Sequence, residues 1–449
     1  MYKRYKIKFM NNYFKQIIIL SVALLVASCS FEEADIFPES SAVRLEKAQK
    51  EYREILCSAP NGWAMEYFPT ASTEGYTLLM KFNTSGKAEM AAKNKYVADK
   101  YTTDSCAFQL IADNGPVLSF PMAGNYEVNG TQIGIFHLFS NPEDPQGSTG
   151  LNGYGLSGDY EFVVLKADSN LVVLQGKKRS TTIYLRRLAA DQSWQGYFEK
   201  LDAMNTFLFG STVHDLSLVL GTDTLNALNG SSHIFSLYPK GGDPVSDVVY
   251  YPFIITPTGI RLHTAYALNS KSVQTFNLSA DKKLLVGTED GTAFFTGPVL
   301  NKFLYSDLSL WKADLTQMSD NFKSIINDLS VALTVKYNGK RNFEYIGITK
   351  KAVYANSIMI RVTGVDATYR IIFTPVAGSA DRVNISLPVD VLNLYDTNGK
   401  KFYNEVPAIK TTLEAFCGEY VVSTEFPLNV KSVKYTRVDN VSHYFLVNR

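Results

Sequence analysis

Turn residues divide most of the chain after residue 62 into short segments of β-forming residues, and this spacing constrains the fold more than any other feature. Gly, Asn, Asp, Ser and Pro recur about every ten positions, as in "NTSG", "ADNGP" and "ADSN". The first segments between them are "GWAMEYF", "GYTLLMKF", "KAEMAAK", "CAFQLIA", "PVLSF", "IGIFHLF", "DYEFVVLK", "LVVLQGKK" and "TTIYLRRL". Short strands at this spacing are typical of an antiparallel meander in a sandwich or a barrel. Their number suits a closed up-and-down barrel of lipocalin-like size.

Three helices are predicted between the strand-rich stretches, from apolar residues at i, i+3, i+4 spacing. These residues are Leu45, Ala48, Tyr52, Ile55 and Leu56; then Trp194, Tyr197, Phe198 and Leu201, with Asp191 as the expected N-cap; then Phe322, Ile325, Ile326 and Leu329 after Ser319. The sequence therefore predicts a mainly β protein with a few helices. Its antiparallel meanders form barrel- or sandwich-like units, each preceded by a helix, over residues 39–189, 190–312 and 313–449.

Two predicted hairpins resemble each other: "FVVLKADSNLVVLQG" from Phe162 and "FNLSADKKLLVG" from Phe276. Divergent repetition of one helix-plus-meander unit explains this similarity. Coincidence also explains it, because turns use few residue types. Both interpretations stay open.

The N-terminus has the composition of a secretory leader. Residues 1–15 contain five basic residues and no acid. The apolar run "IIILSVALLVA" follows at Ile17–Ala27 and is too short to span a bilayer as a helix. Met10 is an alternative start to Met1. The segment Val26–Cys29 resembles a bacterial lipobox, which implies cleavage of residues 1–28 and lipid attachment to the Cys29 sulfur. An ordinary signal peptide with a chance cysteine is the alternative.

Residues 29–38 form an acidic linker containing Glu32, Glu33 and Asp35. Acids at this place resemble the export signal that carries Bacteroidota lipoproteins to the outer face of the outer membrane. A merely solvated linker is the alternative. Without the leader the chain has a small negative net charge, about −4, and no Lys/Arg cluster, so nucleic acid is not an expected partner.

No motif in the sequence predicts catalysis, a cofactor or a metal site. There is no CxxC, HExxH or GxSxG. Three cysteines remain after lipidation, Cys57, Cys106 and Cys417, and whether two of them pair stays open. Cys57, at a helix end, and Cys106, at a strand start, are interpreted as small buried residues. The five histidines are His137, His214, His233, His263 and His443. His137 and His263 lie in strand-like runs and are expected to be structural.

"GYGLSG" at Gly153–Gly158 matches the dinucleotide-binding pattern GxGxxG, but a strand follows it where that chemistry needs a helix. Its glycines are instead expected to allow positive φ in an exposed connection. The surrounding loop, residues 140–159, is long enough to be a binding element, and Asp144, Asn152 and Asp159 are possible calcium ligands without a recognised spacing.

A glycan-binding site would need exposed aromatic side chains. Most of the 27 Tyr and 27 Phe are expected in the core. The tryptophans Trp63, Trp194 and Trp311 are candidates, although core packing is the stronger expectation for Trp63 and Trp194. A pair of glycosidase carboxylates has no fixed sequence spacing, so the sequence does not test it.

"SAVRLEKAQKEYREILCSAPNGWAMEYFP", "YTLLMKFNTSGKAEM" and the "GDYEFVVL…LQGKK" hairpin at 158–178 resemble an uncharacterised family of Bacteroidota lipoproteins, the domain of unknown function DUF4302. The resemblance covers nearly all of the chain after the leader. Its members are similar to accessory lipoproteins of SusC/SusD-type outer-membrane uptake systems, which import glycans or peptides. The family has no agreed catalytic residues, so none is carried over.

We therefore expect a lipid-anchored protein of the outer membrane, exposed at the cell surface, that binds a glycan or peptide nutrient without catalysis. The expected partners are the membrane, through the lipid, and SusC/SusD-like proteins. Two alternatives stay open: a hydrolase acting on glycan or protein at the cell surface, and a structural or assembly subunit of an outer-membrane complex.

Overall fold

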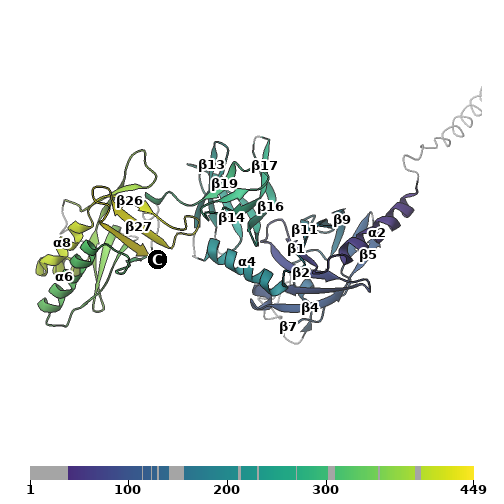
Figure 1. Cartoon of the computed structure of the whole chain (residues 1–449), viewed down its shortest axis with the longest axis horizontal. Coiled ribbons are helices and arrows are strands. Elements are labelled where there is room, and N and C mark those ends of the chain that lie inside the picture. Colours follow the sequence, from purple (N-terminus) through teal and green to yellow (C-terminus); the bar gives the residue numbers. More distant parts are fainter. Residues whose placement is uncertain are drawn as a thin grey trace, which may run out of the picture.

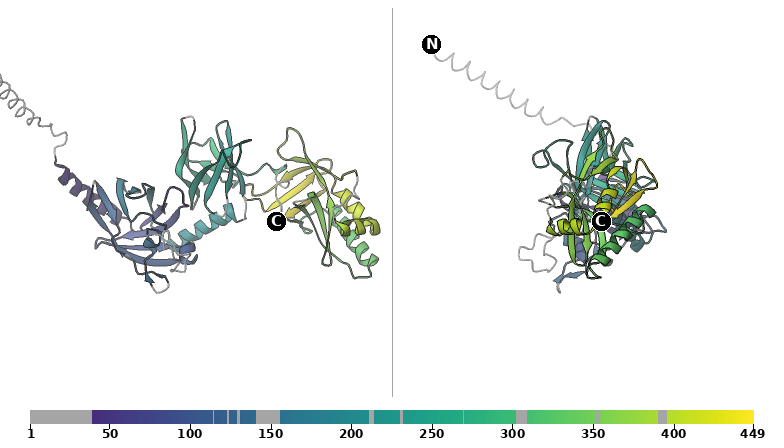
Figure 2. Two further views of the ribbon diagram at one scale, coloured as in Figure 1. Left: turned by 180° about the vertical axis from the view of Figure 1, so that it is seen from behind. Right: turned by 90° about the vertical axis from the view of Figure 1, so that its left-hand side faces the viewer.

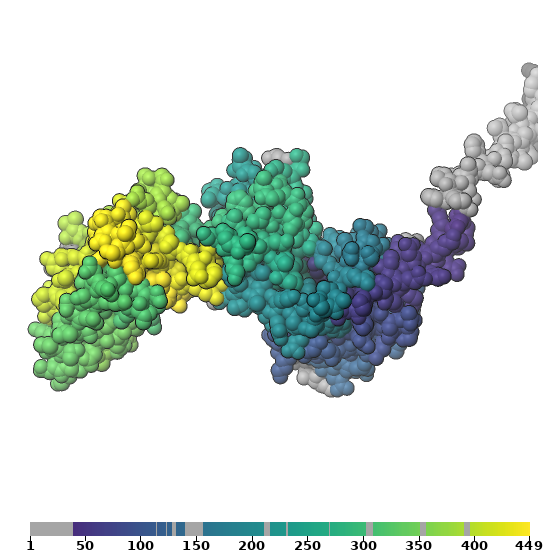
Figure 3. All heavy atoms as spheres, viewed as in Figure 1, coloured from purple at the N-terminus to yellow at the C-terminus, as the bar shows by residue number. Residues whose placement is uncertain are grey.

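The computed structural model describes residues 39–449 except 114, 123, 129–130, 141–155, 211–213, 230–231, 269, 302–308, 352–353 and 390–395. Cys29, the leader and the whole acidic linker lie outside this range. Three large antiparallel sheets follow one another along the long axis, so that the described chain forms three lobes in a row (Figures 1 and 3). We call these lobes the first unit, the barrel and the third unit. The predicted mainly β fold is confirmed.

The first unit is a nine-stranded open sheet that curls around a helix. Its elements are α2 (Ser41–Cys57), β1 (Trp63–Tyr67), β2 (Tyr76–Phe82), β3 (Lys87–Ala92), η1 (Lys95–Val97), β4 (Thr102–Ala107), β5 (Gln109–Ala112), β6 (Pro116–Ser119), β7 (Glu127–Val128), β8 (Thr131–Gln132), α3 (Ile135–Ser140), β9 (Glu161–Ala167), β10 (Leu171–Gly176) and β11 (Thr182–Arg187). The sheet order is β4-β3-β2-β1-β11-β10-β9-β6-β5, and β7 pairs only with β8. Helix α2 begins where the Ser40 side chain accepts from the Val43 amide, and it contacts β2, β5 and β6. Because β2 lies far from β5 in the sheet order, the sheet must curve around the helix.

The barrel closes on itself and is filled with side chains. Its elements are α4 (Trp194–Phe209), β12 (His214–Leu220), β13 (Asp223–Asn229), β14 (Ile234–Pro239), β15 (Val249–Thr256), β16 (Gly259–Leu268), β17 (Lys271–Leu278), β18 (Leu285–Gly287) and β19 (Ala293–Thr296). The Phe235 ring stacks on Phe253 and Phe295 at centroid distances of 4.4 and 4.8 Å. An eight-stranded barrel has an interior just wide enough for such side chains. The barrel interior is therefore core.

The third unit is again a nine-stranded sheet with helices. Its elements are β20 (Trp311–Ala313), α6 (Asp320–Lys336), β21 (Phe343–Lys351), β22 (Tyr354–Val362), β23 (Val365–Arg370), β24 (Ile372–Pro375), β25 (Arg382–Ser386), α7 (Thr397–Glu405), α8 (Pro407–Ala415), β26 (Gly418–Ser423), β27 (Ser432–Arg437) and β28 (Tyr444–Asn448). The order β23-β22-β21-β20-β28-β27-β26-β25-β24 repeats that of the first unit. Strand β20 precedes α6, whereas α2 precedes β1.

Several details differ from the sequence predictions. The segment "IGIFHLF", predicted as a strand, contains α3, and His137 lies on this helix. A short, wholly apolar run does not distinguish strand from helix, and the buried Ile135, Phe136 and Phe139 fit a helical face. The strand count favoured a closed barrel in the first unit, but the closed barrel is the second unit. The first sheet stays open because α2 and α3 fill the space within it.

Two smaller predictions are also corrected. The N-cap of α4 is Ser193, whose hydroxyl accepts from the Gly196 amide at 3.1 Å, and not Asp191. Cys106 lies near the end of β4 and does not open a strand. Among the described helices, none has both the length and the apolar character needed to cross a membrane.

Candidate functional site

Helix α4 lies between the first unit and the barrel (Figures 1 and 2). The outward-facing side chains of the first sheet at this contact are small or apolar: Ala64, Leu79 and Ala91, each at most 1% exposed, belong to the same core cluster as the barrel. From α4, Phe198, Leu201 and Leu208 enter this cluster. The N-terminal turn of α4 extends beyond the barrel and places Trp194 over β3 and β4.

The three tryptophan candidates have different environments. Trp63 and Trp311 are 0% and 1% exposed and belong to the cores of the first and third units. Trp194 is half-buried, and its indole N–H donates to the Asn61 carbonyl at 2.9 Å. This hydrogen bond fixes the ring while one part of it stays open. The predicted core packing is confirmed for Trp63, whereas Trp194 packs against the core with only part of its ring.

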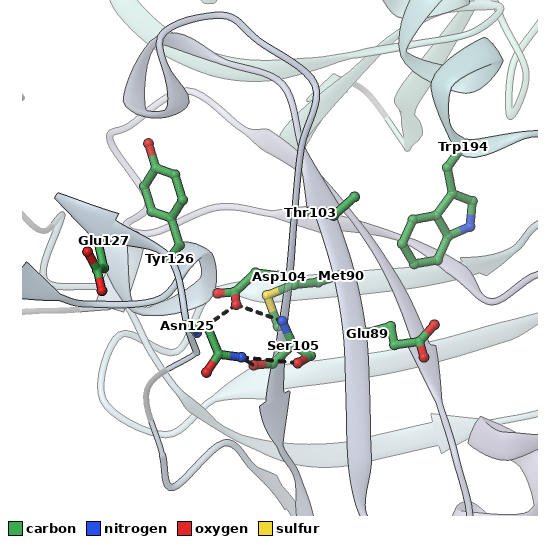
Figure 4. A pocket seen from close by; sticks show the side chains of 9 residues that line it. All are labelled: Glu89, Met90, Thr103, Asp104, Ser105, Asn125, Tyr126, Glu127 and Trp194. Carbon is green, nitrogen blue, oxygen red and sulfur yellow. Dashed lines mark hydrogen bonds between the residues drawn. The ribbon is translucent and has the colours of Figure 1, made fainter.

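Trp194 lines an open hollow of about 820 Å³ at the β4 edge of the first sheet (Figure 4). We call it the Trp194 hollow; its lining residues are Glu89, Met90, Thr103, Asp104, Ser105, Asn125, Tyr126, Glu127 and Trp194. Its size lies within the usual range of small-molecule sites. Figure 4 shows Trp194 and Tyr126 at opposite ends, with β4 between them.

Asp104 builds the wall of this hollow. Its Oδ1 accepts from the amides of Ser105 at 2.7 Å and Asn125 at 2.6 Å, and its Oδ2 accepts from the Ile135 amide at 2.8 Å. One carboxylate therefore ties β4 to Asn125 and to the start of α3. These three donors give Asp104 a structural role.

The rest of the lining is polar around the aromatic rings. Glu89 and Glu127 are exposed, and the Asn125 amide donates to the Ser105 carbonyl and hydroxyl at 3.4 and 3.3 Å. An aromatic face beside carboxylate, hydroxyl and amide groups can hold a ligand that has both an apolar face and hydroxyl groups. Sequence reasoning missed Glu89, Asn125, Tyr126 and Glu127, because no local motif marks residues that meet only in the fold.

The described histidines serve structural contacts. His137 contacts the Phe120 carbonyl at 3.1 Å, and the His443 ring packs on Phe322 at 4.2 Å. His233 lies between Asn205 Oδ1, 3.0 Å from its Nε2, and Glu74 Oε2, 3.3 Å from its Nδ1. Burial lowers the pKa of His137, His233, His263 and His443. The side chain of His214 lies outside the described part.

The cysteines and Gly158 also have packing roles, whereas Gly153 and Gly155 of the glycine motif lie outside the described residues. Cys57, Cys106 and Cys417 are free thiols; Cys106 is buried as predicted, whereas Cys57 is only half-buried. Burial raises the pKa of Cys106 to about 12, with the Asp104 charge adding to the effect. In the glycine motif, a Cβ on Gly158 would lie 2.1 Å from the Tyr67 hydroxyl. Close packing therefore explains this glycine, not the positive φ that the sequence suggested.

Of the possible calcium ligands, Asp144 and Asn152 lie outside the described residues. Asp159 is buried, and its carboxylate accepts from the amides of Lys178 and Arg179 at 2.5 and 2.9 Å. It therefore holds the turn after β10. In the described ranges, no group of three or more His, Cys, Asp or Glu side chains is placed to hold a metal ion.

Fold and site together define a mainly β protein of three units with an aromatic, polar hollow on the first unit. The chain belongs to the DUF4302 family, described as a domain of unknown function, whose model matches residues 33–280. The match spans the first unit and most of the barrel, a shorter range than the resemblance implied, and the third unit lies beyond it. No curated protein matches the sequence significantly.

Solved structures similar to the chain include a protein described as a DNA polymerase III beta subunit from Eubacterium rectale. It is 10% identical, with 90% of this chain and 97% of that one covered and a TM-score of 0.14. The beta clamp of H. pylori in complex with diflunisal has the same identity and coverage and a TM-score of 0.12. The beta subunit of Thermotoga maritima is 9% identical, with 89% and 96% covered and a TM-score of 0.10. Similarity this low carries no argument about fold or function.

Proposed function

We propose that this chain is a lipid-anchored protein of the outer membrane, exposed at the cell surface, which binds a glycan at the Trp194 hollow. It holds the glycan for an uptake system of the SusC/SusD type and does no chemistry on it. The leader ending at Cys29 and the acids after it support the location. A tethered binder keeps its ligand close to the transporter, which raises the local concentration of that ligand.

The observation that carries the binding role is the half-open ring of Trp194. Its N–H is already satisfied by Asn61, so the ring is held in place before any ligand arrives. A sugar ring presents an apolar C–H face and a rim of hydroxyl groups. The apolar face fits the indole, and the rim fits Glu89, Thr103 and Ser105, which lie on the same side of the sheet.

A glycan suits the hollow better than a peptide. An extended peptide would gain most by pairing with the free edge of β4. The side chain of Asn125 already donates to the Ser105 carbonyl on that edge, and its backbone amide is bound by Asp104. The edge is therefore partly occupied, whereas the polar rim and the ring remain open.

The binding role is tested by retention of the purified full-length protein on a glycan array. Trp194→Ala should weaken binding to the retained glycan at least about tenfold, as for other central aromatic contacts. Tyr250→Ala is the matched control, since Tyr250 is 65% exposed on β15 and does not line the hollow. Equal binding by the Trp194→Ala protein would remove the hollow as the site. Cleavage of the bound glycan by the wild-type protein would favour the hydrolase alternative.

The location is tested separately. Cys29→Ala should release the protein from the membrane fraction, and protease added to intact cells should remove the wild-type protein from their surface. Retention of the variant in the membrane, or protection of the wild-type protein in intact cells, would contradict a lipid-anchored surface protein.

A further inference from the structure

A second cavity, of about 450 Å³, opens between the first sheet and the barrel beside α4. We call it the junction cavity; its lining residues are Glu66, Arg186, Tyr197, Thr256, Pro257, Thr258, Arg261, Thr275, Asn277, Thr288 and Glu289. It shares no residue with the Trp194 hollow. Strands from both units and α4 contribute to it, so it exists only because the units are packed together.

Two arginines and one glutamate form the inner end of the cavity. Glu66, on β1, is 4% exposed, and its Oε1 and Oε2 lie 2.8 Å from the Nε atoms of Arg186 and Arg261 respectively. Both guanidinium groups also lie over the Tyr184 ring, at 5.4 and 5.6 Å. Two positive charges face one negative charge, so this end keeps one net positive charge.

The terminal nitrogens of these arginines are available to a ligand. Arg261 Nη1 donates to the Thr275 hydroxyl. Arg186 uses Nε for Glu66, and its Nη atoms make no hydrogen bond to any described residue. Since the Nε contacts and the Tyr184 ring hold both groups in place, a carboxylate meets a preorganised fork.

The walls of the cavity also contain a buried hydroxyl. Thr256 is 9% exposed, and its Oγ1 has no hydrogen-bond partner among the described residues. Glu66 Oε2 and Arg261 Nε lie 2.8 Å from each other and form an ion pair. The Thr256 Oγ1 atom is closed to solvent, so the groups that a ligand can reach are the terminal arginine nitrogens and the polar side chains at the outer end.

The outer end of the cavity carries hydrogen-bonding groups for hydroxyls. Burial opposes ionisation of Glu289, but amide donors at Thr275 and Gln274, 3.1 and 3.3 Å away, help to hold its pKa below the usual value. The Thr258 hydroxyl donates to Asn277 Oδ1 at 2.7 Å. At the inner end, burial and the Glu66 charge raise the pKa of Tyr197, so its phenol stays a donor.

We propose that the junction cavity binds a compact hydroxylated carboxylate, such as one acidic sugar unit. Its carboxylate pairs with the Arg186 and Arg261 guanidinium groups. Its hydroxyls bond to Asn277 and Glu289. A neutral sugar lacks the group that the arginine end requires, and an amino acid has too few hydroxyls for the opposite end. This proposal does not rest on binding at the Trp194 hollow.

The experiment is calorimetric titration of the full-length protein with glucuronate and galacturonate, with glucose and galactose as neutral counterparts and with glutamate as an acid without hydroxyls. The two acidic sugars should bind and the other three should not. Asn277→Ala, which removes a half-buried lining amide, should weaken that binding about three- to tenfold and leave the protein folded. Arg186→Gln should weaken it more, and Trp194→Ala should leave it unchanged.

Four results would overturn the proposal. Binding of none of the sugars would show a cavity that holds water only. Equal binding of acidic and neutral sugars would remove the role of the arginines. Binding of glutamate alone would assign the cavity to another class of ligand. If Trp194→Ala abolished binding and the junction-cavity variants did not weaken it, the acidic sugar would bind at the Trp194 hollow and not in this cavity.

Discussion

The first and third units have the same strand order, but the sheet of the first unit is covered on both faces and that of the third unit on one. In each sheet, the first four strands of the unit lie side by side, and the first strand of the unit pairs with its last strand: β1 with β11, and β20 with β28. In the first unit, all five residues of β1 are buried, since one face packs on the inner core and the other on α4 and the barrel. In the third unit, β20 has the same place in the sheet order as β1, and it alternates between buried and exposed residues. One topology thus gives a sheet with two covered faces or with one.

The side chains on the outer face of each sheet explain why one sheet is covered on both faces and the other on one. Where the first sheet has Ala64, Leu79 and Ala91, the outer face of the third sheet carries Lys434 near the Tyr444 ring at 4.2 Å and Lys312 near Tyr345 at 4.4 Å. Small apolar side chains allow a helix to approach a sheet closely, whereas long charged ones keep the surface solvated. Both proposed sites lie beside the covered face of the first unit.

The largest expected effect is from a charge on that covered face. Ala91→Lys should destabilise the protein by at least about 4 kcal/mol, because it buries an unpaired charge between β3 and α4. Thr436→Lys, at a half-buried position on the outer face of β27, should change the free energy of unfolding by less than about 0.5 kcal/mol. Urea denaturation measures both. Similar losses in the two variants would show that the faces do not differ in this way.

The next effect concerns the ion pairs of the two units. Glu66→Gln should cost about 3 kcal/mol, because it leaves the guanidinium groups of Arg186 and Arg261 without their buried counter-ion. Asp366→Asn removes a 2.7 Å pair with Arg361 in the third unit, where the two side chains are 39% and 30% exposed. That change should cost below about 1 kcal/mol. An equal cost in both units, again by urea denaturation, would contradict the assignment of Glu66 to a desolvated junction.

A smaller effect is expected where the third unit meets α4. The Asn429 amide donates to the carbonyls of Thr206 and Phe207 at 3.3 and 2.8 Å, and so covers the C-terminal end of the helix. Asn429→Ala should cost about 1 kcal/mol. It should also make the link after α4 easier to cleave in limited proteolysis. Asn226→Ala on β13 is the control, with one contact at 3.4 Å, and an identical digestion pattern for all three proteins would contradict the role of Asn429.

The smallest effect is in the dependence of stability on pH. Burial lowers the pKa of His233, with Glu74 opposing the shift and Lys95 adding to it. The folded form therefore binds fewer protons than the unfolded form near the ordinary histidine pKa, and stability falls as the pH drops through about 6.5 toward 5. His233→Gln should flatten this slope at the junction, and His443→Gln should do so in the third unit. Slopes unchanged from the wild-type in unfolding measured from pH 8 to 5 would contradict this.

Sequence patterns predicted what depends on local spacing. The apolar face of α2, the succession of short strands and the mainly β class follow from periodicity and turn residues. Helix α3 was misread because its apolar run is too short to carry a period. The exposure of Trp194 and the meeting of Glu66 with Arg261 depend on how α4 lies between two units, and the strands that contribute those side chains are far apart in the chain. Such sites follow from tertiary packing, which no local signal encodes.

The central claim, that a glycan contacts Trp194, is tested most directly by tryptophan fluorescence. The other two tryptophans, Trp63 and Trp311, are buried, so a bound ligand can reach only the Trp194 ring. Titration of the full-length protein with its array-selected glycan should change the emission saturably, and Trp194→Phe should abolish the change while still binding the glycan more weakly. A saturable change of the same size in the Trp194→Phe protein, or binding without any change in the wild-type, would contradict the account.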